Sequence, residues 1–276
     1  PPLSWQLIEP SIIAEALGAP VVSNLRAADL ARGGQGAPIT PIADWILLRD
    51  QRESRAIVNL GGFCNATILP ASAQPDDIRG FDLCACNQLL DTLARITIDQ
   101  PFDTDGAVAS SGRVNPDLHP TLVAMLTGQA SAARSLGSAD EPAAVGDGWT
   151  ESLHALLSNL KPADVLRTAC AAIADTLAQT EVSKTDRVLI AGGGVFNAAL
   201  RDELDRALPA PVGPTDHVGI PAQHREAIEM AVLGALCDDG VPITLPHITG
   251  CGQPAPVAGV WTSPTQPTKA KPHTPQ

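Results

Sequence analysis

One strand–turn–helix segment in the second half of the chain does most to limit what the chain can fold into. Residues 187–191 predict a buried strand, Gly192, Gly193 and Gly194 follow it, and residues 197–208 have the pattern of a helix. Glycines let backbone approach a bound phosphate or nucleoside, and a helix N-terminus offers unpaired N–H groups. The segment matches neither G-x-G-x-x-G nor G-x-x-x-x-G-K-[ST], so it supports neither a dinucleotide fold nor a Walker loop. Its alternative interpretation is a tight turn in an α/β sheet.

A second glycine turn lies upstream. Residues 56–60 and 66–69 predict two strands, and Gly61-Gly62 between them is typical of a hairpin-like turn. Asp82 follows a strand-like approach at residues 79–81 and precedes an expected helix at residues 87–95. An acid on a turn between two glycine-rich segments suggests a phosphotransferase. The alternative is an Asp that only serves the structure at a strand end.

Composition excludes several classes of protein. The 276 residues carry a net charge of -12, which argues against non-specific nucleic-acid binding, since that needs clustered Lys and Arg. Aromatic residues make up 3% and Tyr is absent, which disfavours stacking platforms for single-stranded nucleic acid. An acidic chain can still bind ATP, because local amides and a metal hold the anion.

The apolar segments and the cysteine spacing of the chain indicate the cellular compartment of the protein. No signal peptide and no apolar run of about 18 residues is found, so neither secretion nor a membrane span is predicted. The six cysteines have no disulfide spacing, and Cys84 and Cys86 lack the second pair that a zinc site needs. We therefore expect reduced thiols and a cytoplasmic protein. The chain opens on Pro1-Pro2 without Met, which suggests a fragment of a longer protein.

A set of short motifs, taken together and in order, resembles the anhydro-N-acetylmuramic acid kinase family. The resemblance runs from about Trp5 to about Gly250. Its segments are residues 24–26, Asp29, 33–38, 59–65, 80–82, 105–106, 111–112, 192–197, 215–216, 219–221, Glu226 and 245–250.

The resemblance implies an α/β protein with the actin-like ATPase (ribonuclease H-like) fold, two lobes and a cleft between them. On this interpretation residues 1–70 are the remainder of an incomplete first lobe, and residues 71–252 form the second lobe with the nucleotide-side glycine loop. Residues 253–276 have the Pro-rich composition of a disordered tail.

The implied activity is that of a sugar kinase. Family members convert 1,6-anhydro-N-acetylmuramic acid, ATP and water to N-acetylmuramic acid 6-phosphate and ADP in cell-wall recycling. Asp82 matches the catalytic base, which takes a proton from the water that attacks the anomeric carbon. Transfer to the 6-oxygen depends on positioning and on Mg²⁺. Glu226 matches an acidic residue of the sugar site, and family members are commonly dimers.

The resemblance also implies binding residues. On the nucleotide side they are Gly192, Gly193, Gly194 and Asn197 of the downstream loop, with Gly61, Gly62 and Asn65 on a turn that faces the cleft. On the sugar side they are Arg26, Asp29, Gln35 and Gly36. No residue is predicted as a metal ligand.

The chain departs from the family pattern at four places. The usual first hundred residues, with a Ser-Gly-Thr-Ser-Leu-Asp-Gly type phosphate loop, have no counterpart. The Gly-Pro-Gly after the base is Cys84-Ala85-Cys86, the usual Asp-Phe-Arg is Asn24-Leu25-Arg26, and residues 131–144 lack the usual cationic segment. These departures leave an alternative open: a catalytically impaired homologue that binds a sugar or a partner without turnover.

Overall fold

The computed structural model describes residues 4, 6–130, 157, 159–252 and 256–265. The chain divides into two compact units. Unit 1 comprises Pro1–Ile39 with Ala231–Gln276, and unit 2 comprises Thr40–Met230. The division falls inside one helix, α11 (Arg225–Asp238).

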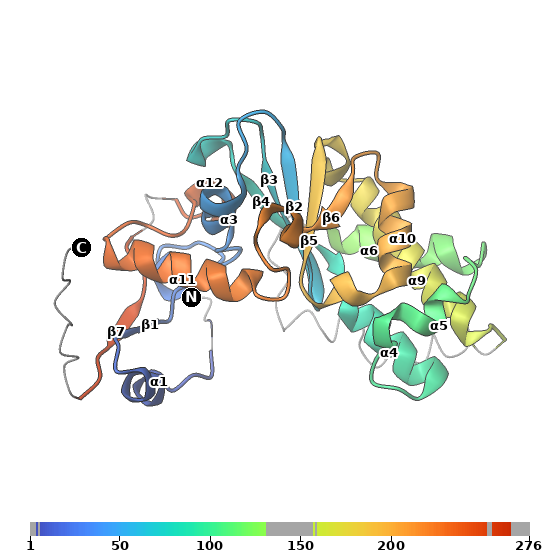
Figure 1. Ribbon diagram of the computed structural model, residues 1–276, viewed down its shortest axis with the longest axis horizontal. Coiled ribbons are helices and arrows are strands. Elements are labelled where there is room, and N and C mark those ends of the chain that lie inside the picture. The colour runs from blue at the N-terminus through green and yellow to red at the C-terminus, as the bar shows by residue number, and fades with distance from the viewer. Residues whose placement is uncertain (1–3, 5, 131–156, 158, 253–255, 266–276) are drawn as a thin grey trace, which may run out of the picture. The chain divides into compact units, whose positions relative to one another are not determined.

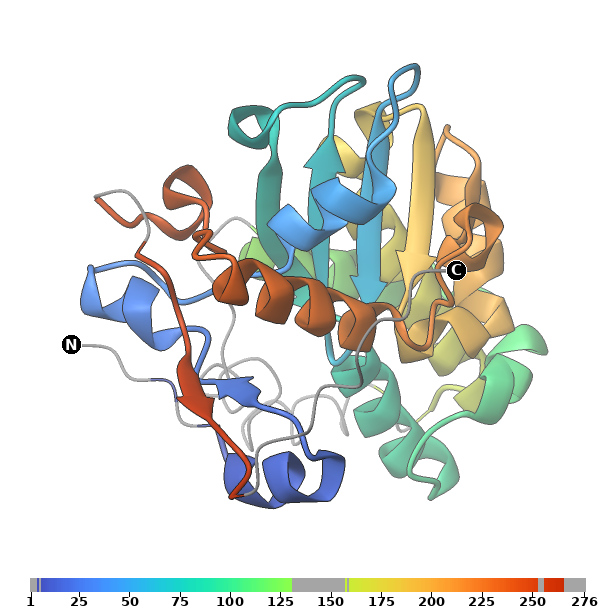
Figure 2. The same ribbon diagram turned by 60° about the vertical axis from the view of Figure 1, so that its left-hand side comes forward.

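Unit 2 is built on a five-stranded sheet, whose strands lie side by side in Figure 2. The order is β4-β3-β2-β5-β6. β2 and β4 run antiparallel to β3, whereas β5 is parallel to β2 and β6 is parallel to β5. The strands are β2 (Arg55–Leu60), β3 (Phe63–Leu69), β4 (Arg79–Ala85), β5 (Arg187–Ala191) and β6 (Val212–Pro214). This is the strand arrangement of the ribonuclease H-like fold on which actin-like ATPases are built, so the predicted fold class is confirmed.

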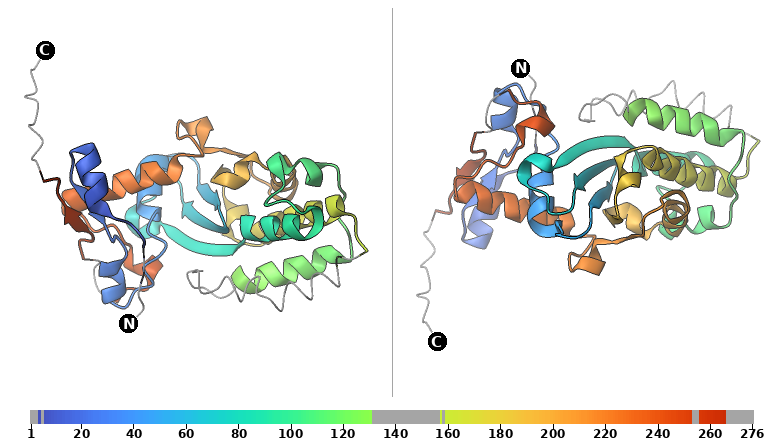
Figure 3. Two further views of the ribbon diagram at one scale, coloured as in Figure 1. Left: turned by 90° about the horizontal axis from the view of Figure 1, so that it is seen from below. Right: turned by 90° about the horizontal axis from the view of Figure 1, so that it is seen from above.

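Helices cover one face of this sheet (Figures 1 and 3). Val58, Leu60, Cys64 and Ala66 of β2 and β3 are buried in one core with the apolar faces of these helices. The helices are α4 (Asn87–Ile98), α5 (Ala107–Ser110), α6 (Leu118–Ala130), α9 (Pro162–Ala178) and α10 (Ala198–Ala207). Alternation along the strands turns Ile57, Asn59, Asn65 and Thr67 to the opposite face. There Thr67 bonds to Asp44 of α3 (Pro41–Leu48).

Short 3₁₀ helices connect these elements. They are η1 (Pro75–Asp77), η2 (Thr104–Gly106), η4 (Glu181–Lys184), η5 (Gly193–Phe196) and η6 (Thr215–Val218). The predicted unit at residues 187–208 is confirmed as β5, the glycine turn with η5, and α10. Asn197 caps α10, because its side-chain oxygen accepts the Leu200 N–H at 3.0 Å.

Unit 1 contains α1 (Pro10–Leu17), α2 (Ala27–Ala31), α12 (Pro246–Thr249) and a two-stranded sheet. In that sheet β1 (Val21–Ser23) pairs antiparallel with β7 (Val260–Thr262). The segment that we expected to be a disordered tail therefore contains a strand. Its composition hides this, because the partner strand lies more than 230 residues away in the sequence. The rest of that tail, residues 253–255 and 266–276, lies outside the described residues, as do residues 131–144.

The expected boundary at residue 70 differs from the division into units. β2 and β3 precede residue 70, but they belong to the same sheet as β4, β5 and β6. Unit 1 instead joins the first 39 residues to the last 46. Local composition carries no information about such pairing between distant segments. None of the helices in the described part of the chain combines the length and apolar character that a bilayer crossing requires.

Candidate functional site

The two glycine turns predicted from the sequence lie at the same end of neighbouring strands. β2 ends at Leu60 and β5 at Ala191, and the parallel register pairs Asn59 with Ala191. A Cβ added to Gly194 would lie 2.6 Å from the Leu60 Cβ, so the second turn packs directly on the end of β2. In open α/β sheets, ligands bind outside the carboxyl ends of the strands. The structure thus brings Gly61, Gly62 and Gly192 to Gly194 together where a ligand is expected.

Gly192 is the position in this turn that most needs to be glycine. Its φ of 85° and ψ of 179° lie in a region that is essentially restricted to glycine. Gly192→Ala would also place a Cβ 3.0 Å from the Leu60 carbonyl oxygen. We expect it to lower the free energy of unfolding by about 2 kcal/mol or more in urea denaturation. Gly193→Ala is the matched control: its φ is not positive, and its Cβ would meet only Asn87 Nδ2 at 3.6 Å. Equal stability of the two variants would contradict this reading of the turn.

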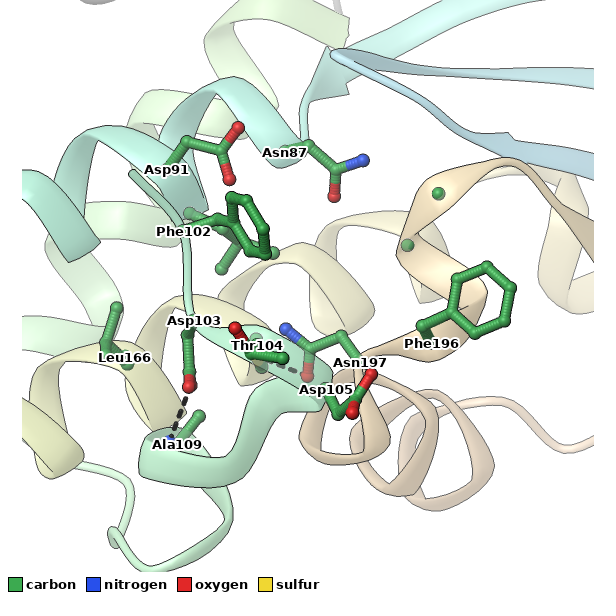
Figure 4. A pocket seen from close by; sticks show the side chains of 14 residues that line it. Asn87, Asp91, Phe102, Asp103, Thr104, Asp105, Ala109, Leu166, Phe196 and Asn197 are labelled. Carbon is green, nitrogen blue, oxygen red and sulfur yellow. Dashed lines mark hydrogen bonds between the residues drawn. The ribbon is translucent and has the colours of Figure 1, made fainter. Parts of the chain in front are cut away.

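A cavity of about 320 Å³ lies beside η5 (Figure 4). Phe102 and Phe196 are about half exposed and supply aromatic rings to its wall. Burial raises the pKa of the Asp91 carboxyl on α4. Asp105 and Phe196 lie in the motif segments but had no predicted binding role. Other lining residues were missed: Asn87, Asp91, Phe102, Asp103 and Thr104.

Hydrogen bonds hold the polar residues of this cavity in place. The Asp103 carboxylate accepts the N–H groups of Val108 and Ala109, both at 2.9 Å, at the start of α5. The Asn87 amide donates to the Leu60 carbonyl at 3.1 Å. The predicted Asn197 lies here too: a Cβ on Gly106 would clash with its Oδ1 at 2.1 Å. The cavity is therefore a preformed hollow with oriented polar groups.

Two further cavities adjoin the same turn, and Phe196 lines all three. One of about 570 Å³ is lined by Arg201, Asp216 and His224 among others. The other, of about 400 Å³, brings the predicted Glu226 together with Gly192, Gly193 and Asn59. Glu226 is exposed in the first turn of α11, where the helix dipole favours a negative charge.

Asp82 was expected on a turn, but it lies inside β4, because the strand continues to Ala85. There it belongs to a row of polar residues that crosses the sheet. It pairs with Asn65 of β3, and Asn65 pairs with Asn59 of β2. Directly paired residues share a face, so these three side chains lie on the face opposite the helix-packed core. Because Asn59 also lines the cavity that contains Glu226, one residue connects the row to that cavity.

A β-bulge lies next to Asp82. Cys64 pairs with Cys84 but Asn65 pairs with Asp82, which leaves Leu83 as the extra residue on β4. Bulges near active sites re-aim a side chain. The cysteines that follow Asp82 turn away from it: Cys84 and Cys86 are fully buried in the helix-packed core. Hydrogen bonds with these two thiols, and burial, raise the pKa of the Cys64 thiol.

The predicted sugar-side residues form a separate group inside unit 1. The Asp29 carboxylate is buried and accepts the Gly36 N–H at 2.8 Å and the Thr249 hydroxyl at 2.7 Å. Arg26 donates to the Gly36 carbonyl at 3.0 Å, and the Gln35 N–H donates to the Thr249 carbonyl at 2.9 Å. Asp29 therefore holds the glycine loop in shape, while Gln35 is exposed on it. Thr249, which completes this arrangement, lies 220 residues away in the motif segment 245–250, and its contact with Asp29 was not predicted.

Within the described residues, no group of three or more His, Cys, Asp or Glu side chains is arranged to hold a metal ion. Mg²⁺ in kinases takes only one or two carboxylates along with substrate phosphates and water. Half-buried Asp82 and exposed Glu226 each carry a carboxylate, the hard oxygen ligand type that Mg²⁺ prefers.

Comparisons with known proteins agree on one family. The family model described as "Anhydro-N-acetylmuramic acid kinase" matches residues 1–262. Proteins of that name from Salinibacter ruber, Gloeobacter violaceus and Bordetella pertussis are 38%, 35% and 36% identical to this chain. The matches cover 92%, 92% and 89% of this chain and 66%, 68% and 64% of those proteins. The chain thus spans about two thirds of the length of the relatives that it matches.

Solved structures show weaker likenesses. An activator of the 2-hydroxyisocaproyl-CoA dehydratase from Clostridium difficile, with bound ADPNP, is 16% identical with a TM-score of 0.46, over 70% of this chain and 63% of that one. A ROK family glucokinase from Streptomyces griseus is 15% identical with a TM-score of 0.32, over 71% and 65%. The family match rests on the sequence alone and covers nearly the whole chain. The chain belongs to the anhydro-N-acetylmuramic acid kinase family.

Proposed function

We propose that this chain carries the catalytic residues of an ATP-dependent kinase for 1,6-anhydro-N-acetylmuramic acid. The product is N-acetylmuramic acid 6-phosphate, as expected for recycling of cell-wall amino sugars. The observation that supports this most is the row Asp82–Asn65–Asn59, whose last member shares a cavity with Glu226 and the Gly192 turn. This row supports a site in which Glu226 lies beside the nucleotide-side turn and Asp82 lies two strands across the sheet from it.

In the proposed reaction, Asp82 accepts a proton from a water molecule as the water oxygen attacks the anomeric carbon. The bond from that carbon to the 6-oxygen breaks, and the 6-oxygen takes the γ-phosphoryl group of ATP, which releases ADP. Glu226 is proposed to bind the sugar at its exposed position on α11. Mg²⁺, when bound, neutralises charge on the phosphates.

The nucleotide is proposed to bind along the glycine turn. Gly192, Gly193 and Gly194 let its phosphates approach the backbone, while Gly61, Gly62 and Asn65 form the neighbouring turn and strand. The cavity with Phe102, Phe196 and Asn197 suits a nucleoside, because aromatic walls and a few oriented polar groups are typical of such sites. For the sugar, we propose the loop that Asp29 and Arg26 hold, with Gln35 and Gly36 as contacts.

The wider assignments rest on family membership. We propose that the protein acts in the cytoplasm, where its sugar substrate and ATP would be available, and that it forms a homodimer. The alternative, a homologue that binds without turnover, rests on the sequence departures. The burial of Cys84 and Cys86 in the core weakens one of them, because these side chains do not crowd Asp82.

The test is a reaction of this chain with anhydro-N-acetylmuramic acid, ATP and Mg²⁺ in H₂¹⁸O. We expect one phosphoryl group on the sugar and one ¹⁸O atom at its anomeric carbon, both detected by mass spectrometry. Omission of the sugar is the control for simple ATP hydrolysis. Nucleotide binding in calorimetry without any phosphorylated sugar would favour the non-catalytic alternative.

A further inference from the structure

A buried ionic cluster lies directly behind Glu226. It consists of Asp44, Thr67, Arg225 and Glu229, whose exposed fractions are 0%, 3%, 3% and 1%. Arg225 Nη2 lies 2.7 Å from each Asp44 oxygen and 2.7 Å from Glu229 Oε1. The Thr67 hydroxyl donates to Asp44 at 2.6 Å. We call these four residues the Arg225 cluster.

The cluster joins three elements of unit 2. Asp44 lies on α3, Thr67 on β3, and Arg225 with Glu229 on the first turns of α11. Arg225 Nε also donates to Asp44 at 3.1 Å, so a planar guanidinium is fixed by more than one bond. Fixing Arg225 fixes the rotation of α11 about its axis. Since successive side chains on a helix diverge by about 100°, it also fixes the direction of Glu226, the next residue.

The same cluster is attached to the strand that faces Asp82. Thr67 lies two residues along β3 from Asn65, on the same face, and Asn65 pairs with Asp82. The start of α11 is thereby bonded to the strand that sets where Asp82 lies. Both candidate acids depend on β3 for their positions.

The charge of the cluster suits this task. Asp44 and Glu229 together face one guanidinium, and burial, followed by the nearby Asp44, raises the pKa of Glu229 to about 10. Glu229 is therefore protonated at neutral pH, and the cluster has no net charge. A neutral cluster holds the helix without placing an uncompensated charge behind Glu226.

We propose that Arg225 is a positioning residue, which together with Asp44 and Glu229 sets the place of Glu226 relative to Asp82. The proposal rests on the proposed function for the meaning of Glu226. It goes beyond that function, which assigns no role to the cluster, although Arg225 lies at the wall of the cavity that contains Glu226.

Replacing all four residues of the Arg225 cluster by apolar ones distinguishes an effect on the position of Glu226 from an effect on the stability of the fold. The variant combines Asp44→Leu, Thr67→Val, Arg225→Met and Glu229→Leu, so that no buried polar group is left without its partner. Such replacements often leave stability unchanged or raise it. We expect an unchanged or higher melting temperature, a kcat lower by about 100-fold, and a KM for ATP within about threefold, since a small misplacement of a catalytic group costs that much.

Two other variants test whether the loss of activity comes from the Arg225 cluster. Arg225→Lys keeps the charge but loses the planar fork, and we expect a fall in kcat of about tenfold. Arg225→Lys also tests the proposal if the fourfold variant does not fold. The matched control combines Arg167→Met on α9 with Glu203→Leu on α10. These two residues form another ion pair, in which the charged atoms lie 2.6 Å apart and Glu203 is 2% exposed. We expect its kcat to be unchanged.

Amide hydrogen exchange reports on how firmly α11 is held, and it does not require kinase activity. Hydrogen exchange of the amides of residues 226–230 should be at least about tenfold faster in Arg225→Lys and in the fourfold variant than in the wild type. If the wild type has no kinase activity, the proposed function fails, but this exchange still decides the role of the cluster. The proposal would be overturned if the fourfold variant exchanged these amides at the wild-type rate and had a kcat within threefold of the wild type.

Discussion

Asp82→Asn is expected to lower the kcat of sugar phosphorylation by about 10³-fold, while the KM for ATP changes little. An amide has the shape of the carboxylate and fits the same place on β4, but it cannot take a proton from water. Steady-state kinetics with a coupled ADP assay measures the loss. Because Asp82 is only half-buried on an edge strand, the melting temperature should stay within a few degrees of the wild type.

The control for this prediction is Asp76→Asn. Asp76 is an exposed acid in η1, just before β4, and it has no role in the proposed site. Its kcat should equal that of the wild type. An Asp82→Asn enzyme that keeps more than a tenth of the activity would show that another group takes the proton.

Glu229→Gln is expected to flatten the dependence of stability on pH. The groups that face Glu229 are Asp44 of α3 and Arg225 and Glu226 of α11. Burial, Asp44 and Glu226 raise its pKa from 4.5 to about 10, although the Arg225 charge acts to lower it. Between these two values the unfolded chain loses the proton while the folded chain keeps it. This contribution to stability is therefore complete below pH 4.5 and falls by about 1.4 kcal/mol per pH unit as the pH rises toward 10.

Urea denaturation at pH 6, 7.5 and 9 tests this prediction. Gln reproduces the neutral form at every pH, so the difference in unfolding free energy between Glu229→Gln and wild type should grow in favour of the variant. Glu203→Gln is the matched control. Glu203 is as buried as Glu229, but its carboxylate accepts bonds from Arg167 and Arg206, both at 2.6 Å. We expect that variant to lose stability at all three pH values. A constant difference for Glu229→Gln would contradict a protonated Glu229.

Local patterns predicted the parts of the fold that depend on neighbouring residues. The apolar run before Gly192 and the hairpin at Gly61 are each specified within about ten residues, and both are confirmed. β7 was missed, because three residues in a Pro-rich segment give no periodic signal. Its pairing with β1 depends on a contact that no local window contains.

The same limit applies to the site. The glycine turns stand out because each lies at a strand end with an unusual local composition. Asp82 stood out as an acid close to an expected helix, but its place inside β4 did not. Arg225 gave no such signal: its partner Asp44 lies 181 residues earlier in the chain. The expected effect of Cys84 and Cys86 on the turn after Asp82 also depended on side-chain direction. The bulge at Leu83 sets that direction, and a bulge has no clear mark in the sequence.

The row Asp82–Asn65–Asn59 has a consequence for how this site tolerates change. Neighbouring strands lie about 4.8 Å apart, so two strand widths, about 10 Å, separate the backbone at Asp82 from that at Asn59. Main-chain hydrogen bonds maintain this spacing, and they are insensitive to which side chains fill the core. Substitutions in the helix layer can therefore tilt or shift helices while the width between the acid and the glycine turn stays the same. In the proposed site, the backbone of the sheet would then limit the size of the substrate, and the loops and α11 would set selectivity.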